Sequence, residues 1–285
     1  MTQQTTLGVI GAGNMADALI KGIGVRGLLP PSSIWVTNRS NRARLQALGA
    51  RYGVQTTAAK TLLLARSSVL VIAVKPADTP TVLDELRGRV GRNQLVISVV
   101  AGFPLSRLEG ALPGVAVIRA MPNTSAAVQA SATALATGTH VTADQLTMAA
   151  DLFRAVGDVV VTAEGVLDVV TGLSGSGPAY VYYLIEAMIH AGVELGLSDE
   201  LARRLAVQTL HGAAQMLVTT AEDPAELRRR VTSPGGTTMA ALGVLADRGF
   251  STAVRDAIER AAARAREMSG EPGQDTGLSA RIVTE

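Results

Sequence analysis

The sequence contains no cysteine among its 285 residues. This absence excludes disulfide bonds, a thiolate nucleophile and cysteine-ligated metals. Aromatic residues make up only 3% of the chain, which argues against a surface that stacks nucleic-acid bases. The formal net charge is +2 with no long run of one sign, and the short cluster Arg228-Arg229-Arg230 is interpreted as a solvated helix face. We therefore expect no nucleic-acid partner.

Long hydrophobic runs and metal-binding patterns are also missing. No apolar segment is long enough to cross a bilayer. Residues 1–6 are polar and uncharged, unlike the start of a secretory signal. No cluster of histidines and acids has the spacing of metal ligands, so we expect no metal. Together these absences predict a cytoplasmic protein that binds no membrane.

The chain has ample material for a core. Hydrophobic residues make up 47% of it, and its length suits one large domain or two ordinary ones.

A glycine-rich turn near the N-terminus is the most informative stretch. Residues 5–16 read TTLGVIGAGNMA, an apolar run that ends in Gly11-Ala12-Gly13 and is followed by helix formers. The pattern G-x-G-x-x-A, with Ala16 in the third place, is typical of a strand, tight turn and helix that bind a dinucleotide. Gly11 permits the turn, and the missing side chain of Gly13 lets a pyrophosphate approach free N–H groups at the helix start. A plain structural turn is the alternative, but the strand before it and the helix after it favour dinucleotide binding.

The end of the second predicted strand, residues 34–37, indicates which dinucleotide is bound. An NAD-preferring fold has an acid near this point for the ribose hydroxyls. Here the strand is followed by Asn38, Arg39 and Ser40, which offer hydrogen-bond donors and one fixed positive charge. These groups suit a 2′-phosphate, so we expect a preference for NADPH over NADH. An ordinary exposed arginine at a helix start is the alternative.

Strand and helix patterns alternate through the first half of the chain. The run at 69–74 is wholly apolar, as expected of a central parallel strand, and it leads into Lys75-Pro76 at the edge of the sheet where ligands bind. From this position Lys75 can reach the cofactor, and a solvated lysine at the tip of a loop is the alternative. The fold class is therefore α/β, with a Rossmann-type, doubly wound, mostly parallel sheet. Strands are predicted at 7–10, 34–37, around 54, 69–74, 95–100, 115–118, 131–136 and 159–161, and helices at 16–25, 41–48 (closed by Gly49), 57–65, 79–86 and 142–156.

The second half of the chain has only helical patterns. We expect helices at about 167–172, 179–195, 198–217, from 223, 239–245 and 250–268. Glycine-rich turns precede two of them, at 172–178 and 233–238. The predicted domains are 1–163 for the dinucleotide and 164–268 as an all-helical domain, followed by a disordered tail at 269–285. The apolar helix faces suit either a subunit interface or a monomer core.

Five stretches together resemble pyrroline-5-carboxylate reductases. They are residues 11–16 (GAGNMA), 74–76 (VKP), 119–124 (RAMPNT), 172–180 (GLSGSGPAY) and 233–238 (SPGGTT). The resemblance implies reduction of 1-pyrroline-5-carboxylate to L-proline with NAD(P)H, the last step of proline biosynthesis. It also implies a helical domain that interlocks two subunits, commonly within a decamer of five dimers. Two departures are Ser125, where members often have proline, and Lys60, where some have asparagine; the second bears on the adenosine side.

The resemblance also implies site residues. Its implied substrate contacts are Ser233, Pro234, Gly235, Gly236, Thr237, Thr238 and Glu164. Its implied cofactor contacts are Gly11, Gly13, Asn14, Met15, Asn38, Arg39, Ala73, Val74, Lys75, Pro76, Ala101, Met121, Pro122 and Asn123, the last three near the nicotinamide. The predicted cofactor contacts also include Ala12 in the glycine turn and Ser40 after the second strand.

The residues themselves suit this chemistry. A cyclic imine needs orientation against the hydride donor and a protonated ring nitrogen, but no covalent activation. The turn at 233–238 opens a helix, whose free N–H groups suit a carboxylate. We expect Thr238 to be the catalytic residue that hydrogen-bonds the ring nitrogen and holds its proton. A plain helix N-cap is the alternative role for Thr238.

Two other functions compete with this one. A reductase of another small imine or a hydroxy-acid dehydrogenase shares the two-domain plan, but such dehydrogenases rely on a helix-borne lysine. The helical half of this chain has no lysine. A non-catalytic NADPH-binding oligomer is the other alternative, and its signature would be a damaged substrate turn, whereas both turns are whole.

Overall fold

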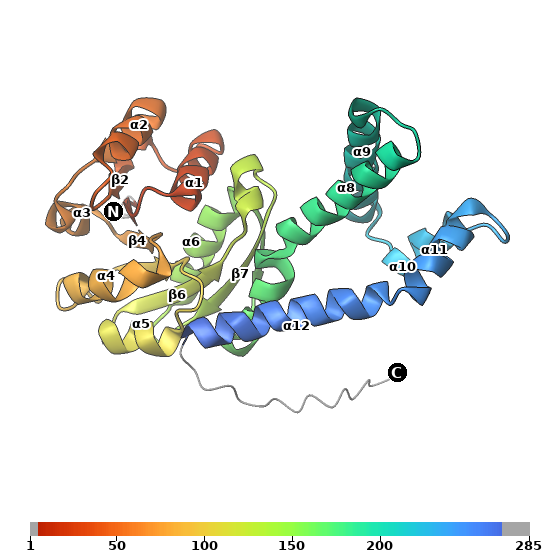
Figure 1. Ribbon diagram of the computed structural model, residues 1–285. Coiled ribbons are helices and arrows are strands. Elements are labelled where there is room, and N and C mark those ends of the chain that lie inside the picture. Colours follow the sequence, from red (N-terminus) through yellow and green to blue (C-terminus); the bar gives the residue numbers. More distant parts are fainter. Residues whose placement is uncertain (1–4, 270–285) are drawn as a thin grey trace. The chain divides into compact units, whose positions relative to one another are not determined.

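The computed structural model describes residues 5–269, which form two compact units (Figure 1). The first unit runs to Gly175 and takes up the chain again from Arg260, and the second is Ser176–Glu259. The predicted domain boundary at 163/164 stays a prediction. Of the predicted tail, Ser269 is the last residue of a helix, and 270–285 lie outside the described residues.

The first unit is built on an eight-stranded sheet of order β3-β2-β1-β4-β5-β6-β7-β8. Neighbouring strands are parallel except for β6 and β7, which pair antiparallel. The predicted α/β class with a mostly parallel sheet is thus confirmed. The strands are β1 (Leu7–Ile10), β2 (Ile34–Thr37), β3 (Gln55–Thr56), β4 (Val69–Ile72), β5 (Leu95–Ser98), β6 (Ala116–Met121), β7 (Ser131–Thr137) and β8 (Gly157–Val161).

Helices cover both faces of this sheet with separate cores. One core joins the sheet to α1 (Asn14–Val25), α2 (Arg42–Tyr52) and α6 (Ala143–Arg154). The other joins it to α3 (Lys60–Arg66), α4 (Thr79–Leu86), α5 (Leu105–Ala111) and α7 (Leu167–Val170). Short 3-10 turns lie at Pro31–Ser33, Pro76–Asp78, Thr124–Val128 and Glu164–Val166, and a π-helical turn at Thr171–Gly175.

Several helices of the first unit differ from their predicted bounds by a few residues, and α2 and α5 depart most from the sequence prediction. Helix α2 does not stop at Gly49 but continues to Tyr52, and Gly53 closes it in the left-handed region at φ +69°. Gly49 lies inside the helix, where an added Cβ would come within 3.1 Å of Thr56 Cγ2. Helix α5 was not predicted. It has seven residues and no side-chain cap, and depends on burying Leu105, Leu108 and Ala111.

The second unit is helical, as expected. It contains α8 (Gly177–Glu194), α9 (Asp199–Thr220), α10 (Pro224–Arg230), α11 (Thr237–Asp247) and the first part of α12 (Phe250–Ser269). Helices α8 and α9 lie side by side around buried Ile189, Ala202 and Ala206 (Figure 1). Many large apolar side chains of this unit are exposed, including Tyr183 at 75%, Leu195 at 86% and Val218 at 79%. This unit therefore presents an extensive apolar surface for its size.

Candidate functional site

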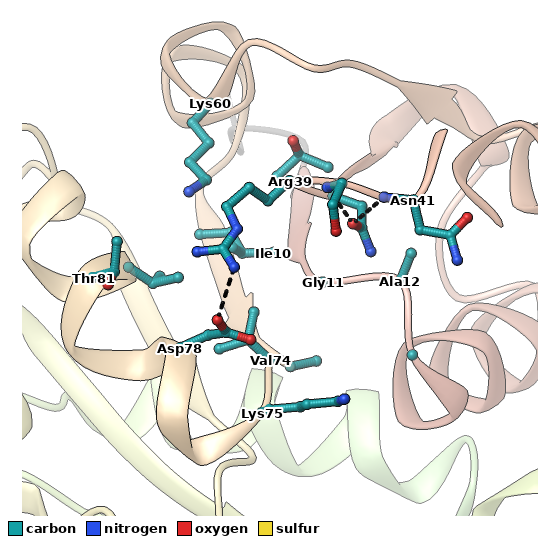
Figure 2. A pocket seen from close by; sticks show the side chains of 16 residues that line it. Ile10, Gly11, Ala12, Arg39, Asn41, Lys60, Val74, Lys75, Asp78 and Thr81 are labelled. Carbon is teal, nitrogen blue, oxygen red and sulfur yellow. Dashed lines mark hydrogen bonds and ion pairs between the residues drawn. The ribbon is translucent and has the colours of Figure 1, made fainter. Parts of the chain in front are cut away.

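A pocket of about 430 Å³ lies at the carboxyl ends of β1, β2 and β4. This is the point where the chain order of the sheet reverses direction, because β2 and β4 flank β1 on opposite sides. Open α/β sheets bind their ligands at such a switch point. Figure 2 shows the charged side chains of Arg39, Lys60, Lys75 and Asp78 gathered around the pocket.

The glycine turn forms the floor of this pocket. Gly11 has φ +112°, and a Cβ there would lie 2.2 Å from the carbonyl oxygen of Ala73, just after the adjacent strand β4. Only glycine fits this close approach. At Gly13, by contrast, an added Cβ would meet nothing within 4 Å. The turn is therefore tight against the sheet at Gly11 and open toward a ligand at Gly13.

Helix α1 begins at this turn with unfilled hydrogen-bonding capacity. Its N-cap is Gly13, and no side chain caps the helix. The first-turn N–H groups are thus available for an anion such as a pyrophosphate. At the end of β2, the hydroxyl Oγ1 of Thr37 is buried and has no hydrogen-bond partner within the described part of the chain. Both features fit a polar ligand in the pocket.

Asp17 lies in the first turn of α1, where its charge would repel a phosphate, but two hydrogen bonds and the more distant guanidinium of Arg51, at 3.9 Å, hold it. Arg44 Nη2 donates to Asp17 Oδ2 at 2.5 Å, and Tyr52 Oη donates to Asp17 Oδ1 at 2.5 Å. Arg44 Nε also donates to the carbonyl oxygen of Ala12 at 3.2 Å, which ties α2 to the glycine turn. Burial and the hydrogen bond to Asp17 raise the pKa of Tyr52 above its usual 10.0, so the phenol keeps its proton at neutral pH.

The mouth of the pocket carries three cations and one acid. Arg39 Nη2 lies 3.2 Å from Asp78 Oδ1, and Lys60 forms an ion pair with Glu85 on α4. Lys75 has no ion-pair partner within residues 5–269. The excess of positive charge suits a phosphorylated ligand.

The loop after β2 has a defined shape. Asn38 Oδ1 accepts hydrogen bonds from the backbone N–H groups of Ser40 and Asn41, both at 3.1 Å. Its oxygen therefore fixes the turn that presents Arg39.

Nine of the predicted cofactor residues line this one pocket. They are Gly11, Ala12, Gly13, Asn38, Arg39, Ser40, Ala73, Val74 and Lys75. Asn14 and Met15 open α1, and Pro76 begins the turn after β4. The lining residues that sequence reasoning did not assign to the cofactor include Thr37, Asn41, Lys60, Asp78 and Thr81. Asp78 follows Lys75 by three residues in the same turn, and that spacing was the available signal.

The other predicted cofactor residues lie outside this pocket. Ala101 follows β5, and Met121 ends β6, so they lie at the same edge of the sheet as the end of β4, because these three strands are parallel. Met121 is 4% exposed and belongs to a core. Asn123, just after Pro122, is held on three sides. It donates from its backbone to Ser131 Oγ (3.1 Å) and from Nδ2 to the Ser174 carbonyl (3.0 Å), and its Oδ1 accepts from Ser125 (3.1 Å).

Glu164, predicted to contact substrate, takes part in a buried ion cluster. Arg119, on β6, has a side chain only 3% exposed, and its Nη1 and Nη2 lie 3.2 Å from Glu164 Oε1 and Asp168 Oδ1. Glu164 Oε1 also accepts from the Leu105 N–H at 2.5 Å. This cluster ties the segment after β8 to the sheet, and no pattern in the sequence predicted it. A substrate contact by Glu164 stays a prediction.

The predicted substrate turn precedes α11 in the second unit. Gly235 has φ +69°, and the Gly236 N–H donates to the Ser233 carbonyl oxygen at 3.0 Å. The N-cap is Gly236, with no side-chain cap, and Thr238 is the second helical residue. The alternative interpretation of Thr238 as the N-cap is therefore wrong. The first-turn N–H groups of α11 are left without a capping side chain, which suits a small carboxylate.

Two further observations concern metal sites and membrane-spanning helices. Within residues 5–269, no three histidine, aspartate or glutamate side chains gather as a metal site would require. No helix in the same part of the chain has both the length and the apolar character needed to span a bilayer.

Comparisons with known proteins agree on one family. A family model for pyrroline-5-carboxylate reductase dimerisation matches residues 164–268, and one for NADP oxidoreductase, coenzyme F420-dependent, matches 6–102. Pyrroline-5-carboxylate reductase 1 of Bacillus subtilis is 42% identical over 267 residues, covering 93% of this chain and 90% of the relative. The Arabidopsis thaliana pyrroline-5-carboxylate reductase is 39% identical over 263 residues, covering 92% and 95%.

Solved structures show the same likeness. A pyrroline-5-carboxylate reductase from Coxiella burnetii has a TM-score of 0.88 at 37% identity and covers 94% of this chain and 99% of its own. The Plasmodium falciparum pyrroline carboxylate reductase with NADP bound has a TM-score of 0.84 at 27% identity, covering 94% and 100%.

Proposed function

The chain belongs to the pyrroline-5-carboxylate reductase family, and on that premise we propose which of its residues hold the cofactor and the substrate. The protein is an oxidoreductase acting on CH–NH groups. It reduces 1-pyrroline-5-carboxylate to L-proline in proline biosynthesis, uses a nicotinamide cofactor and self-associates. When bound, the reduced nicotinamide supplies the hydride. The protein's task is to bind the substrate, to orient it against the cofactor and to hold the proton of its ring nitrogen.

The dinucleotide pyrophosphate binds at the start of α1. The open space above Gly13 and the uncapped first-turn N–H groups support this assignment. Arg44 and Tyr52 help by holding the Asp17 carboxylate, which reduces its repulsion of the phosphates. Ala101 and the segment Met121, Pro122 and Asn123, at the edge where the parallel strands β5 and β6 end, would hold the nicotinamide.

Arg39 binds the 2′-phosphate and gives the enzyme its preference for NADPH. The guanidinium lies at the pocket mouth with Lys60 nearby, and the end of β2 has no acid for the ribose hydroxyls (Figure 2). We expect Arg39→Gln to lower the ratio of kcat/KM for NADPH over NADH about tenfold, the loss expected for a charge-assisted hydrogen bond. Initial rates with both cofactors measure it. The control is Arg42→Gln on the exposed start of α2, and an unchanged ratio in Arg39→Gln would contradict the assignment.

The turn from Ser233 to Thr238 binds the substrate carboxylate. Its supporting feature is the uncapped start of α11, where Gly235 and Gly236 leave the backbone N–H groups accessible. Thr238 hydrogen-bonds the ring nitrogen and holds the proton that makes the imine carbon electrophilic.

The role of the Thr238 hydroxyl is tested by one variant that removes it and one that keeps it. We expect Thr238→Ala to lower kcat about a hundredfold with substrate in excess, and Thr238→Ser to keep most of the activity. NADPH absorbance with pyrroline-5-carboxylate gives the rates. Full turnover in the alanine variant would remove the proton role and leave only carboxylate binding by the turn. A panel of other cyclic imines and hydroxy acids tests the substrate assignment itself.

Assembly and location complete the proposal. The exposed apolar helices of the second unit support a dimer, and we propose a decamer of five dimers, about 294 kDa for ten chains of 29.4 kDa. Light scattering measures that mass. A cytoplasmic location is part of the same proposal, and cell fractionation tests it.

A further inference from the structure

Asp78 introduces a negative charge into a pocket expected to bind phosphate. Among the described residues that line this pocket it is the only carboxylate, beside the cations Arg39, Lys60 and Lys75. Figure 2 shows the Arg39 side chain reaching from the loop after β2 to Asp78 in the turn before α4. The two charged groups are 3.2 Å apart. The one guanidinium suited to a 2′-phosphate is therefore already paired.

The orientation of the Asp78 carboxylate is informative. Asp78 ends the 3-10 turn Pro76–Asp78 and holds the N-cap position of α4 with helical backbone angles, and its side chain makes no capping hydrogen bond. The carboxylate is directed at Arg39 and lies where it offsets the positive charge of the pocket mouth.

We propose that Asp78 sets the cofactor balance by competing with the 2′-phosphate for Arg39. This inference rests on the proposed role of Arg39. The side chains of Arg39 and Asp78 are 65% and 40% exposed, so the ion pair is weak and a phosphate displaces it at small cost. A cofactor without the phosphate leaves the pair intact. The aspartate thus narrows the preference for NADP(H) over NAD(H) without abolishing it.

The test measures nucleotide fragments that separate the 2′-phosphate from the rest of the cofactor. Isothermal titration of the full chain gives Kd for 2′,5′-ADP and for 5′-AMP. We expect Asp78→Asn and Asp78→Ser to tighten 2′,5′-ADP about two- to fivefold, the range set by an exposed ion pair, and to leave 5′-AMP unchanged. The gain decreases at high salt, because exposed charges are screened. Serine serves as a second variant because it is well tolerated at an N-cap.

Asp84→Asn is the matched control. It removes the same charge from α4, the helix that follows Asp78, and Asp84 pairs with Arg87 outside the pocket. Unchanged or weaker 2′,5′-ADP binding in both Asp78 variants, or an equal gain in Asp84→Asn, would overturn the proposal. Arg39→Gln separates the two claims. If Arg39→Gln leaves the preference for 2′,5′-ADP over 5′-AMP unchanged, the proposed role of Arg39 fails. If Arg39→Gln lowers that preference while the Asp78 variants have no effect, only the role of Asp78 fails.

Discussion

Single residues around the glycine turn balance charge beside the proposed phosphate site. Tyr52 donates to Asp17, and burial together with this contact raises its pKa above 10.0. The folded protein therefore keeps a proton that the unfolded chain loses as pH rises, so this contribution to stability is present below about pH 10 and is lost above it. We expect Tyr52→Phe to lower the free energy of unfolding by about 1 to 2 kcal/mol at pH 7. Urea titrations should show the gap between the two proteins closing as pH rises above about 10; a constant gap would contradict the role of the phenol proton.

At the scale of elements, one buried arginine joins β6 to the segment that follows β8. Arg119 is 3% exposed at its side chain and faces two carboxylates, those of Glu164 and Asp168. Removing one partner of a buried ion pair leaves uncompensated charge and costs about 3 to 5 kcal/mol. We expect that loss for Arg119→Met in urea unfolding. The exposed pair of Arg154 with Asp151 is the control, where Arg154→Met should cost less than about 1 kcal/mol. Equal losses of unfolding free energy in the two variants would show that burial does not increase the contribution of Arg119 to stability.

At the scale of the whole molecule, we expect self-association to bury the apolar surface of the second unit. Tyr183 on α8 and Val218 on α9 are 75% and 79% exposed in the single chain. A charge on such a surface opposes its burial in an interface. We expect the double variant Tyr183→Glu, Val218→Glu to shift the light-scattering mass toward that of the 29.4 kDa chain. Val25→Glu, on the 70% exposed end of α1, should leave the mass unchanged. An unchanged mass in the double variant would place the interface elsewhere.

The sequence alone determined the features that depend on near neighbours in the chain. The strand, turn and helix at Gly11 and Gly13 follow from local backbone chemistry, and the buried strands follow from unbroken apolar runs such as β4. The mostly parallel sheet and the helical second half were predictable for the same reason, since both are patterns of period and length. The gathering of the loops after β1, β2 and β4 around one pocket was predictable because parallel strands bring their carboxyl ends to one edge.

Only the tertiary structure decided what depends on residues distant in the sequence. Helix α5 has no strong local signal and is fixed by packing against the sheet. The pairing of Arg39 with Asp78, and that of Arg119 with Glu164, join residues 39 and 45 positions apart. The sequence alone does not show which charged residues will form an ion pair. Folding chooses the partner because burial and geometry decide which charges come within a few ångströms of each other.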